Sequence, residues 1–375
     1  MRALLLGSLA LALACGHPAA QAKPSKASPH AQPSSRRDAG TPYGDSARVR
    51  ELAKTLAQSH ELPQTWVRQQ LQQARFLKGV PKLVLPPAVP TTKNWQAYRE
   101  RFIESRRIDA GAAFWQRHQD ALARAEQQYG VPAEVVVGII GVETFYGQHM
   151  GQHRLLDALT TLTLDFPAAH PRAAERQAFF QNELGQFLRL VRQQSLAIDD
   201  VRGSFAGAMG WPQFMPSSVN RFAVDFDGDG HIDLRQSPVD AIGSVAHYLR
   251  AFGWQTGMPT HYPVRFDDSR LDKATLLAPD ILPSFSVATF QDKGVVLDGD
   301  AQRHSGPLAL VELFNGDAPP SYVAGTENFY VVTRYNWSSY YAMAVIELGQ
   351  AVKARVQAAA PTPTAHARAP ADRGE

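Results

Sequence analysis

The sequence predicts a mainly α-helical protein (α+β class) that carries a small β-containing module. Apolar residues recur at intervals of three and four over several long segments, which is the spacing of one helix face. Residues 133–142 are apolar on every side, which is typical of a helix buried at the centre of a domain. Between residues 261 and 335 the pattern changes to short β-prone runs separated by Gly, Pro and Asp.

Composition bounds the kinds of protein that the chain can be. With 375 residues, 44% of them hydrophobic, it can bury roughly three-quarters of its unfolded surface and form one large or two to three small packed units. Its formal charge is +3 and its isoelectric point is near 8.9, without a basic block that interleaves aromatic residues. We therefore expect no nucleic-acid partner, and we expect a monomer.

The first 22 residues have the features of an export signal. Arg2 precedes an apolar run over residues 3–14, which is too short to span a bilayer. Cleavage after Ala22 fits a small-x-small pattern, whereas Cys15, the only cysteine, stands where a bacterial lipoprotein carries its lipid. We favour lipidation of Cys15 and a periplasmic protein attached to the outer membrane. The alternative is a soluble periplasmic protein.

The remaining chain divides by composition and pattern. Residues 23–45 and 357–375 are rich in Pro, Ser, Ala and charge, so we expect a flexible linker and a disordered tail. We assign residues 46–260 to the helical and catalytic core and residues 261–335 to the β-containing module. Residues 336–356 are expected to form a helix that returns to the core.

Start and stop signals frame the individual elements. Ser46 and Pro63 are helix start signals, Gly130 and Gly253 are stop signals, and Pro132 opens a further helix. We predict helices over residues 47–58, 63–75, 94–107, 109–129, 133–142, 173–191 and 238–252. Within the β-containing module we predict β-structure over residues 308–314 and 329–333.

Glu143 is the leading candidate for a catalytic residue. It ends the apolar helix, where the partial negative charge of the helix terminus disfavours an anion. Apolar neighbours such as Ile140 and Phe145 desolvate it, and both effects raise its pKa. A carboxyl that stays protonated near neutral pH suits a general acid for glycosidic cleavage. Glu134 falls on the opposite helix face and is not its partner.

Glycoside hydrolysis ordinarily uses two carboxylates. In this chain the other candidates for a second catalytic carboxylate are a row of aspartates, and their spacing is that of a metal-binding loop. A mechanism with a single carboxyl is therefore worth considering, in which a hydroxyl of the substrate replaces water and the product is an internal anhydro ring.

Residues 203–215 have the composition of a ligand-binding wall. The glycines of G-S-F-A-G-A-M-G allow tight turns and close approach of a ligand to the backbone. Trp211, Phe214 and Met215 add apolar surface of the kind on which sugar rings rest. Ser204 and Gln213 add hydrogen-bonding groups. Without its neighbours, the same segment could also be a core helix that packs through small residues.

A row of aspartates predicts a structural Ca²⁺ site. Asp225, Asp227, Asp229 and Gly230 match D-x-D-x-D-G, which directs carboxylates at one cation and turns sharply at the glycine. The remaining expected ligands are the His231 backbone carbonyl, Asp233 and, at the sixteenth loop position, Asp240. Gln236 at the twelfth position cannot supply the bidentate carboxylate of a standard EF-hand, so we expect an enlarged loop. An all-oxygen set favours Ca²⁺ over zinc.

In combination, the motifs resemble the lytic murein transglycosylases of the membrane-bound B type. The resemblance covers about residues 95–356. The motifs are V-G-I-I-G-V-E-T, G-S-F-A-G-A-M-G, Q-F-M-P-S-S, D-G-D-G-H-I, D-A-I-G-S-V-A and T-R-Y-N. The resemblance implies a lysozyme-like helical core with an EF-hand-like calcium site. It also implies cleavage of the β-1,4 bond between N-acetylmuramic acid and N-acetylglucosamine in peptidoglycan strands, which leaves a 1,6-anhydromuramoyl end.

The same resemblance assigns roles to individual residues. It makes Glu143 the catalytic acid and base and places Ser204 and Gln213 beside the scissile bond. It adds further residues that line the groove, namely Tyr98, Tyr248, Asn336 and Tyr341. The chain departs from the family pattern at Phe145-Tyr146, at Trp211-Pro212 and by one extra residue between Asp233 and Asp240.

Two other functions are compatible with parts of the sequence. A lysozyme-type muramidase would hydrolyse the same bond, but it would need a second carboxylate to position water. A non-catalytic, calcium-dependent peptidoglycan-binding protein would account for the aspartate loop and the groove. It would leave Glu143 unexplained.

Overall fold

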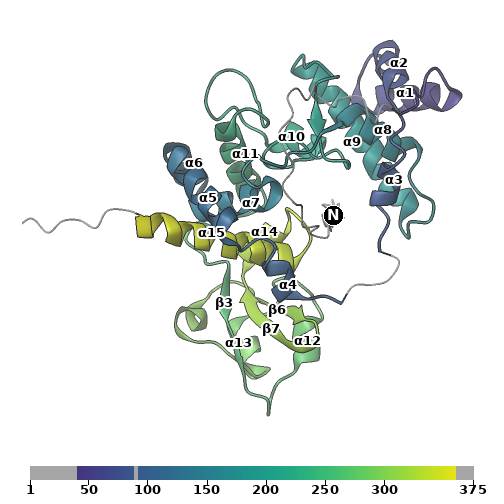
Figure 1. The fold of residues 1–375 in the computed structure, drawn as a ribbon. Coiled ribbons are helices and arrows are strands. Elements are labelled where there is room, and N and C mark those ends of the chain that lie inside the picture. Colours follow the sequence, from purple (N-terminus) through teal and green to yellow (C-terminus); the bar gives the residue numbers. More distant parts are fainter. Residues whose placement is uncertain (1–39, 88–91, 360–375) are drawn as a thin grey trace, which may run out of the picture.

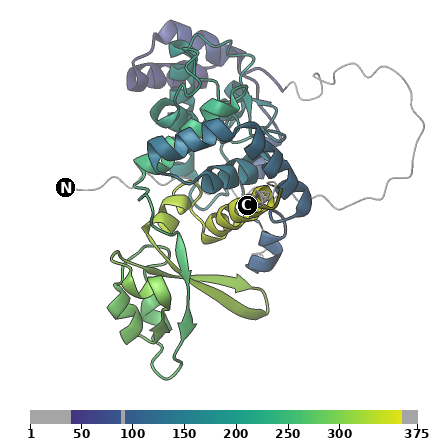
Figure 2. The ribbon, with the colours of Figure 1, turned by 90° about the vertical axis from the view of Figure 1, so that its left-hand side faces the viewer.

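A computed structural model describes residues 40–87 and 92–359 of the chain. The expected export signal, Cys15, most of the linker and most of the tail lie outside the described residues. Figure 1 shows the helices gathered in one part of the molecule and a small sheet with two short helices in another, and Figure 2 shows the same division from a second direction. The predicted mainly α-helical fold with a small β-containing part is confirmed.

Two helices form the centre of the molecule. Helix α7 (Ala133–Thr144) is apolar on all sides, as predicted, and packs along α15 (Ser339–Ala359). Their backbones approach closely at two glycines. A Cβ atom on Gly138 would lie 2.2 Å from the Val345 carbonyl oxygen, and one on Gly349 would lie 2.1 Å from that of Glu134. Near this contact Lys353 Nζ pairs with Glu134 at 2.8 Å.

The region before α7 differs from the prediction. The helix expected over residues 94–107 is α4 (Trp95–Arg99), a set of turns and the start of α5 (Ser105–Arg117). Glu104 causes the break because its carboxylate accepts the backbone N–H groups of Arg106 and Arg107 at 2.8 Å and so caps α5. The helix expected over residues 109–129 is also divided. At His118 the backbone leaves helical geometry between α5 and α6 (Gln119–Tyr129).

Further helices flank the centre. The helices predicted over residues 47–58, 63–75, 173–191 and 238–252 correspond to α1 (Ala47–His60), α2 (Gln64–Gln73), α9 (Ala173–Gln193) and α11 (Pro238–Ala251). The sequence interpretation missed the helices α3 (Val80–Leu83), α8 (Leu155–Leu164) and α10 (Pro216–Phe222). Helix α8 is buried at nine of its ten positions, so it shows no alternation between polar and apolar faces.

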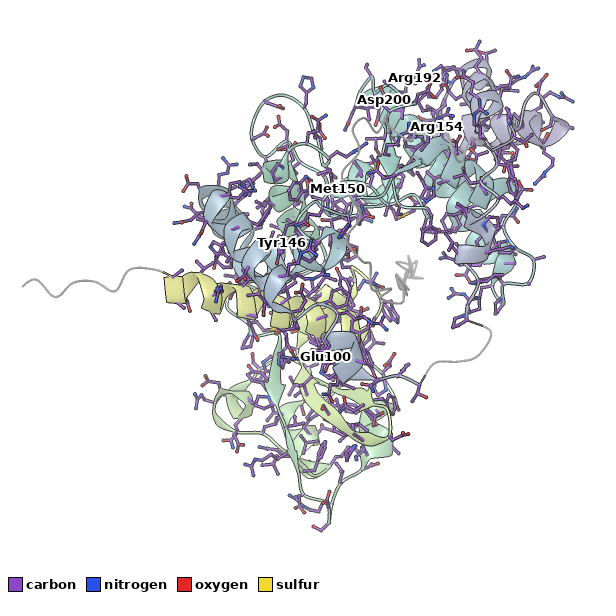
Figure 3. The ribbon with its side chains drawn as sticks, viewed as in Figure 1. Glu100, Tyr146, Met150, Arg154, Arg192 and Asp200 are labelled. Atoms are coloured by element: carbon purple, nitrogen blue, oxygen red, sulfur yellow. The ribbon has the colours of Figure 1, made fainter. Side chains whose placement is uncertain are left out.

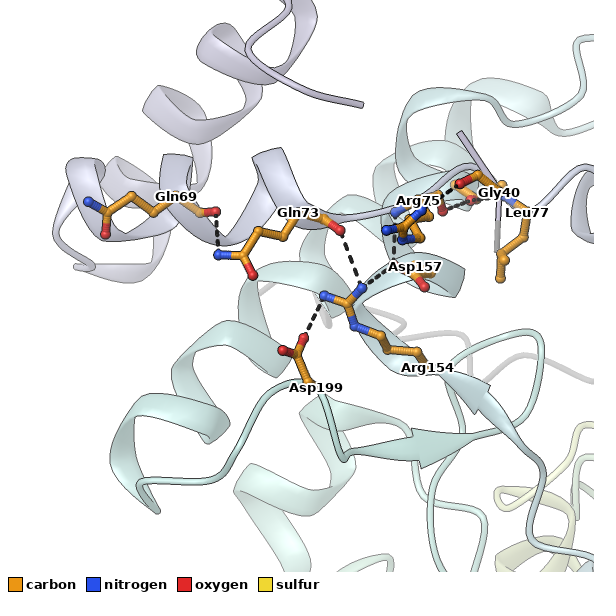
Figure 4. Close-up of polar contacts among 9 residues, drawn as sticks. Gly40, Gln69, Gln73, Arg75, Leu77, Arg154, Asp157 and Asp199 are labelled. Carbon is orange, nitrogen blue, oxygen red and sulfur yellow. Dashed lines mark hydrogen bonds and ion pairs between the residues drawn. The ribbon is translucent and has the colours of Figure 1, made fainter. Parts of the chain in front are cut away.

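A polar cluster ties α2 to α8 (Figure 4). Arg154 ends a two-stranded ribbon of β1 (His153–Arg154) and β2 (Arg202–Gly203). Its guanidinium contacts Asp157 Oδ1 at 3.1 Å, Asp199 Oδ1 at 2.7 Å and the Gln73 carbonyl oxygen at 3.3 Å. Asp157 also accepts the Arg75 backbone N–H at 2.8 Å. The start of α8 is therefore fixed to the end of α2 by directional bonds.

The β-containing part has a hydrophobic cluster of its own. Its sheet has the antiparallel order β3 (His261–Pro263), β7 (Ala318–Gly325), β6 (Ala309–Asn315), and β4 (Arg265–Phe266) pairs with β5 (Val295–Val296). Three short helical segments cover them: α12 (Lys273–Leu277), α13 (Val287–Asp292) and the 3₁₀ turn η1 (Gly299–Arg303). Buried Leu276, Phe290 and Leu310 belong to this cluster and not to the main core.

One strand prediction is confirmed and one is wrong. Strand β6 matches the expected β-structure at 308–314. The β-prone run at 329–333 is instead helix α14 (Glu327–Thr333), whose first turn is capped by the Thr326 side chain. Phe329, Val331 and Val332 of this helix pack into the main core, and that tertiary burial outweighs their strand preference. Within residues 40–87 and 92–359, no helix is both long and apolar enough to cross a membrane.

Candidate active site

Glu143 lies in the last turn of α7, beside Tyr341 of α15. The residue is half-buried, and burial is the larger of two effects that together raise the pKa of its carboxyl from 4.5 to about 7. Tyr341 on α15 donates its hydroxyl to Glu143 Oε1 at 2.6 Å, which lowers the pKa by a smaller amount. In the described part of the chain no second carboxylate is among the groups that shift this pKa. Glu143 can therefore exist protonated or ionised near neutral pH.

The backbone turns sharply directly after Glu143. Phe145 and Tyr146 both adopt left-handed geometry, with φ of 51° and 54°, and Gly147 follows with φ of 81°. Arg107 supports this helix end because its Nη1 donates to the Gly141 carbonyl at 2.7 Å and its guanidinium lies 4.5 Å from the centre of the Phe145 ring. The segment from Tyr146 through Met150 to Arg154 then crosses from α7 to the α8 side of the molecule (Figure 3).

Three tyrosines surround the carboxyl. Tyr341 stacks on Tyr335 with ring centres 6.1 Å apart, and Tyr335 donates its hydroxyl to the Pro212 carbonyl at 2.6 Å. Burial, followed by the charge of Glu143, raises the pKa of Tyr335 and of Tyr341 well above the ordinary value. The same two causes raise the pKa of Tyr98 on α4 to about 12. All three phenols are therefore protonated donors at neutral pH.

Tyr335 was missed as a site residue. It stands inside the T-R-Y-N motif, so the signal was the aromatic residue next to Asn336. Tyr248, which was predicted as a groove residue, contacts this group of tyrosines through Tyr335. Its hydroxyl donates to the Arg334 carbonyl at 2.8 Å, and its ring lies 4.9 Å from that of Tyr335. Asn336 Oδ1 is buried and has no hydrogen-bond partner within the described residues.

Ser204 lies in a compact turn and not in a helix. Its Oγ accepts the Ala208 backbone N–H at 3.0 Å, so its own hydroxyl hydrogen is available to another acceptor. The turn fits tightly against the chain that follows Glu143. A Cβ atom on Gly151 would lie 2.2 Å from the Gly203 carbonyl oxygen.

Gln213 is held by its amide nitrogen. Nε2 donates to the Gly210 carbonyl at 2.9 Å and to the Met150 carbonyl at 3.3 Å, and the residue has a left-handed φ of 48°. Such a φ is uncommon for a residue other than glycine and is kept only where the surroundings fix it. The structure thus joins Glu143 directly to Tyr341, while Ser204 and Gln213 are fixed within their own loops.

The aspartate loop between α10 and α11 gathers three of the predicted ligands (Figure 1). Carboxylate oxygens of Asp225, Asp227 and Asp229 lie within 4.8 Å of one another, and all three residues are exposed. Asp225 accepts the backbone N–H groups of Gly228 and Gly230 at 2.7 and 2.8 Å, which folds the loop around it. Oxygen-only donors at this spacing fit a hard cation such as Ca²⁺.

The other predicted ligands have different surroundings. Asp240 is buried, and its two oxygens accept backbone N–H groups of Phe226 at 2.7 Å and Asp233 at 2.8 Å. Asp233 Oδ1 accepts the N–H groups of Arg235 and Gln236 at 2.8 and 2.9 Å. His231 is exposed, and its N–H donates to Asp229 at 2.8 Å. Asp240 therefore closes the loop through hydrogen bonds to its backbone.

Comparison with known proteins places these features in one family. Residues 44–350 match the transglycosylase SLT domain. The chain is 39% identical over 332 residues to membrane-bound lytic murein transglycosylase B of Escherichia coli K12, covering 85% of this chain and 86% of that protein.

Solved structures agree with this sequence similarity. The soluble lytic transglycosylase SltB1 of Pseudomonas aeruginosa superimposes with a TM-score of 0.74 at 39% identity and covers 83% of this chain and all of that one. The Escherichia coli lytic transglycosylase Slt35 in complex with calcium has a TM-score of 0.71 at 37% identity, with coverage of 85% and 97%.

Proposed function

Because this chain belongs to the transglycosylase SLT domain family and is a lytic transglycosylase that acts on peptidoglycan, we propose that Glu143 is its single acid and base. The observation that carries the proposal is one half-buried carboxyl with a pKa of about 7, on which no second carboxylate acts within residues 40–87 and 92–359. Its helical core is of the lysozyme-like type. A carboxyl with this pKa can give a proton in one step and accept one in the next.

The proposed reaction has two proton transfers. Protonated Glu143 donates its hydrogen to the glycosidic oxygen between N-acetylmuramic acid and N-acetylglucosamine, and the bond from that oxygen to muramic C1 breaks. The Glu143 carboxylate then accepts the hydrogen of the muramic C6 hydroxyl, and O6 forms a bond to C1. The enzyme returns to its starting state, no water is consumed, and the product ends in a 1,6-anhydro ring.

Polar and aromatic residues near Glu143 support a sugar-binding groove. We infer that Ser204 donates its available hydroxyl to the substrate and that Asn336 Oδ1 accepts a substrate N–H or O–H, since a buried acceptor without a partner is costly. We infer that Gln213, whose φ of 48° is left-handed, belongs to the same wall. Tyr98, with Trp95 and Tyr340 against it, offers an aromatic surface.

The pH dependence of turnover tests the role of Glu143. Because the acid must be protonated, kcat/KM for soluble glycan strands should fall above about pH 7. The hydrogen bond from Tyr341 lowers the pKa, so Tyr341→Phe should move this descending limb to higher pH. Tyr340→Phe, which removes a hydroxyl bonded to the Phe314 backbone, is the matched control and should leave the limb in place. A limb that Tyr341→Phe does not move would contradict the assignment.

We propose that the 225–240 loop binds one structural Ca²⁺. Asp225, Asp227 and Asp229 would hold it, together with the His231 carbonyl and Asp233, while Asp240 would act as a ligand or as the backbone clamp described above. The cation supplies charge neutralisation for the loop. The calcium complex of the related Escherichia coli enzyme supports this proposal.

Calcium should stabilise the folded protein. A ligand that binds only the folded state adds about 2.7 kcal/mol at a hundred times its dissociation constant. The melting temperature should therefore rise with calcium and rise less with magnesium, which demands a tighter octahedral shell. Asp225→Ala should erase the calcium-dependent rise, whereas Asp267→Ala, at a half-buried aspartate of the β-containing part, should not. An equal melting temperature with calcium and with chelator, in metal-free protein, would refute the site.

We propose that Cys15 carries a lipid anchor to the outer membrane. The lone cysteine after the apolar run supports this, as does the similarity to a protein described as membrane-bound. Several acyl chains on one residue bind a bilayer firmly. Cys15→Ala should therefore move the protein from the membrane fraction to the soluble periplasmic fraction. A parent protein that is already soluble and begins at Lys23 would exclude the anchor.

A further inference from the structure

Trp211 is bonded on one side to the exit of the aspartate loop. Its backbone N–H donates to the Leu234 carbonyl at 2.8 Å, and its indole Nε1–H donates to the Arg235 carbonyl at 3.0 Å. These carbonyls follow Asp233 directly. The loop also approaches the neighbouring Gly210, where a Cβ atom would lie 2.3 Å from the Leu234 carbonyl oxygen. Both polar hydrogens of Trp211 therefore depend on the position of this loop exit.

On its other side Trp211 contacts the residues around Glu143. The hydroxyl of Thr144, a fully buried residue next to Glu143, lies 3.0 Å from the Trp211 carbonyl oxygen and 3.2 Å from that of Ile140, and its one hydrogen is shared between them. The same hydroxyl accepts the Gly147 N–H at 3.1 Å. The indole ring covers Gly147 so closely that a Cβ atom there would lie 2.7 Å from ring carbons. Trp211 thus fixes the turn that ends the helix of Glu143.

The two residues that follow Trp211 belong to the candidate groove. The Pro212 carbonyl accepts the hydroxyl of Tyr335, which stacks on Tyr341, the hydrogen-bond donor to Glu143. Gln213 comes next, with its left-handed φ of 48°. A displacement of the Leu234–Arg235 backbone would therefore reach both Glu143 and Gln213 through Trp211.

We propose that Trp211 is a positioning residue that couples the 225–240 loop to the sugar-binding groove. The inference rests on the proposed groove and calcium loop. An aromatic residue that only filled the core would stabilise the fold through its buried apolar area, and that effect does not depend on direction. Trp211 is instead half-buried and makes directional bonds to two different elements. Ordering of the loop by a cation should consequently tighten glycan binding, and glycan should tighten cation binding by the same factor.

Binding measurements in an inactive background test the coupling. In Glu143→Gln protein, the dissociation constant for a short glycan strand is measured with calcium and with chelator. The dissociation constant for calcium is then measured with and without the glycan strand. We expect both to change by the same factor, about fivefold or more. Adding Trp211→Phe removes the indole donor to Arg235 but keeps the backbone bond to Leu234, so it should reduce both factors clearly without bringing them to one. Because the readout is binding, a failure of the catalytic assignment would appear separately, as turnover by Glu143→Gln.

Trp254→Phe is the matched control. Trp254 is buried, and its indole N–H also donates to a backbone carbonyl at 2.9 Å, but that carbonyl belongs to Gly130, outside the loop. This variant should lose stability and keep the coupling factor.

Thr144→Val breaks the link from the other side and should lose the coupling, while Thr144→Ser should retain it. Equal coupling in the parent background and in Trp211→Phe, or no effect of calcium on glycan binding in the parent background, would overturn the proposal.

Discussion

Replacing Glu143 by glutamine should abolish turnover of peptidoglycan and stabilise the folded protein above neutral pH. The amide can neither donate nor accept the transferred proton. Each general acid or base step ordinarily contributes about 10²–10⁴ in rate, and here one residue serves both. We expect a loss of at least about 10³-fold, with binding of glycan strands retained. Digestion of sacculi at more than a few per cent of the parent rate would rule out the assignment.

The stability gain follows from the raised pKa of Glu143. A carboxyl whose pKa is about 7 when folded and 4.5 when unfolded contributes fully to stability below pH 4.5. That contribution is lost as the pH rises through 7, because an ionised carboxylate is then buried. The difference in free energy of unfolding between Glu143→Gln and the parent should therefore grow from pH 4.5 to pH 8, by on the order of 3 kcal/mol.

A glutamate on the same helix provides the control for both measurements. Glu134 pairs with Lys353 at 2.8 Å and lies away from the tyrosine cluster. Glu134→Gln should keep turnover and should show no stability gain with rising pH. Thermal unfolding of the three proteins at pH 4.5 and pH 8 separates the cases. If Glu143→Gln were less stable than the parent at pH 8, burial of the carboxylate would not be the cause of the raised pKa.

Replacing Gly138 by alanine should damage fold and activity together. The added Cβ would lie 2.2 Å from the Val345 carbonyl oxygen, which belongs to the backbone and cannot turn aside. Overpacking costs about 1–3 kcal/mol, and we expect the upper end, against a gain of about 1 kcal/mol in helix propensity. The net loss should be about 2 kcal/mol. Separating α7 from α15 also separates Glu143 from Tyr341, so kcat/KM should fall about tenfold or more.

Gly79→Ala is the matched control for this prediction. Gly79 has a φ of −79°, and among the described residues other than its two chain neighbours no atom lies within 4 Å of the position that its Cβ would occupy. Its substitution should change the free energy of unfolding by less than about 0.5 kcal/mol and leave turnover unchanged. Chemical denaturation and glycan digestion measure both effects. Equal stability of Gly138→Ala and the parent would show that the α7–α15 contact tolerates expansion.

The sequence predicted those features whose cause is local. The apolar run of α7, the start signals at Ser46 and Pro63 and the aspartate spacing each act within a few residues, and the first two correspond to elements of the structure. Features that depend on contacts between residues far apart in the chain could not be predicted from the sequence. Phe329–Thr333 reads as a strand because its residues prefer one, but the Thr326 cap and burial in the main core make it a helix.

The candidate site shows the same limit. The apolar setting of Glu143 was visible in its neighbours, and the raised pKa agrees with that reading. The hydrogen bond from Tyr341 joins residues 198 positions apart, and the contact between Tyr335 and Pro212 joins residues 123 apart. No spacing in the sequence indicates such pairs. The resemblance to a family supplied Tyr341, while Tyr335 was missed and Trp211 was predicted only as apolar surface, without its contacts to Thr144 and Arg235.

The central claim is that a single carboxyl cleaves the glycan without water. Digestion of purified sacculi in water enriched in heavy oxygen, followed by mass spectrometry of the released muropeptides, tests it most directly. If Glu143 acts as proposed, the main products carry no heavy oxygen, lack a reducing end and weigh one water less than lysozyme products of the same material. Main products with a reducing end that carry the heavy-oxygen label would contradict the claim and make the enzyme a hydrolase.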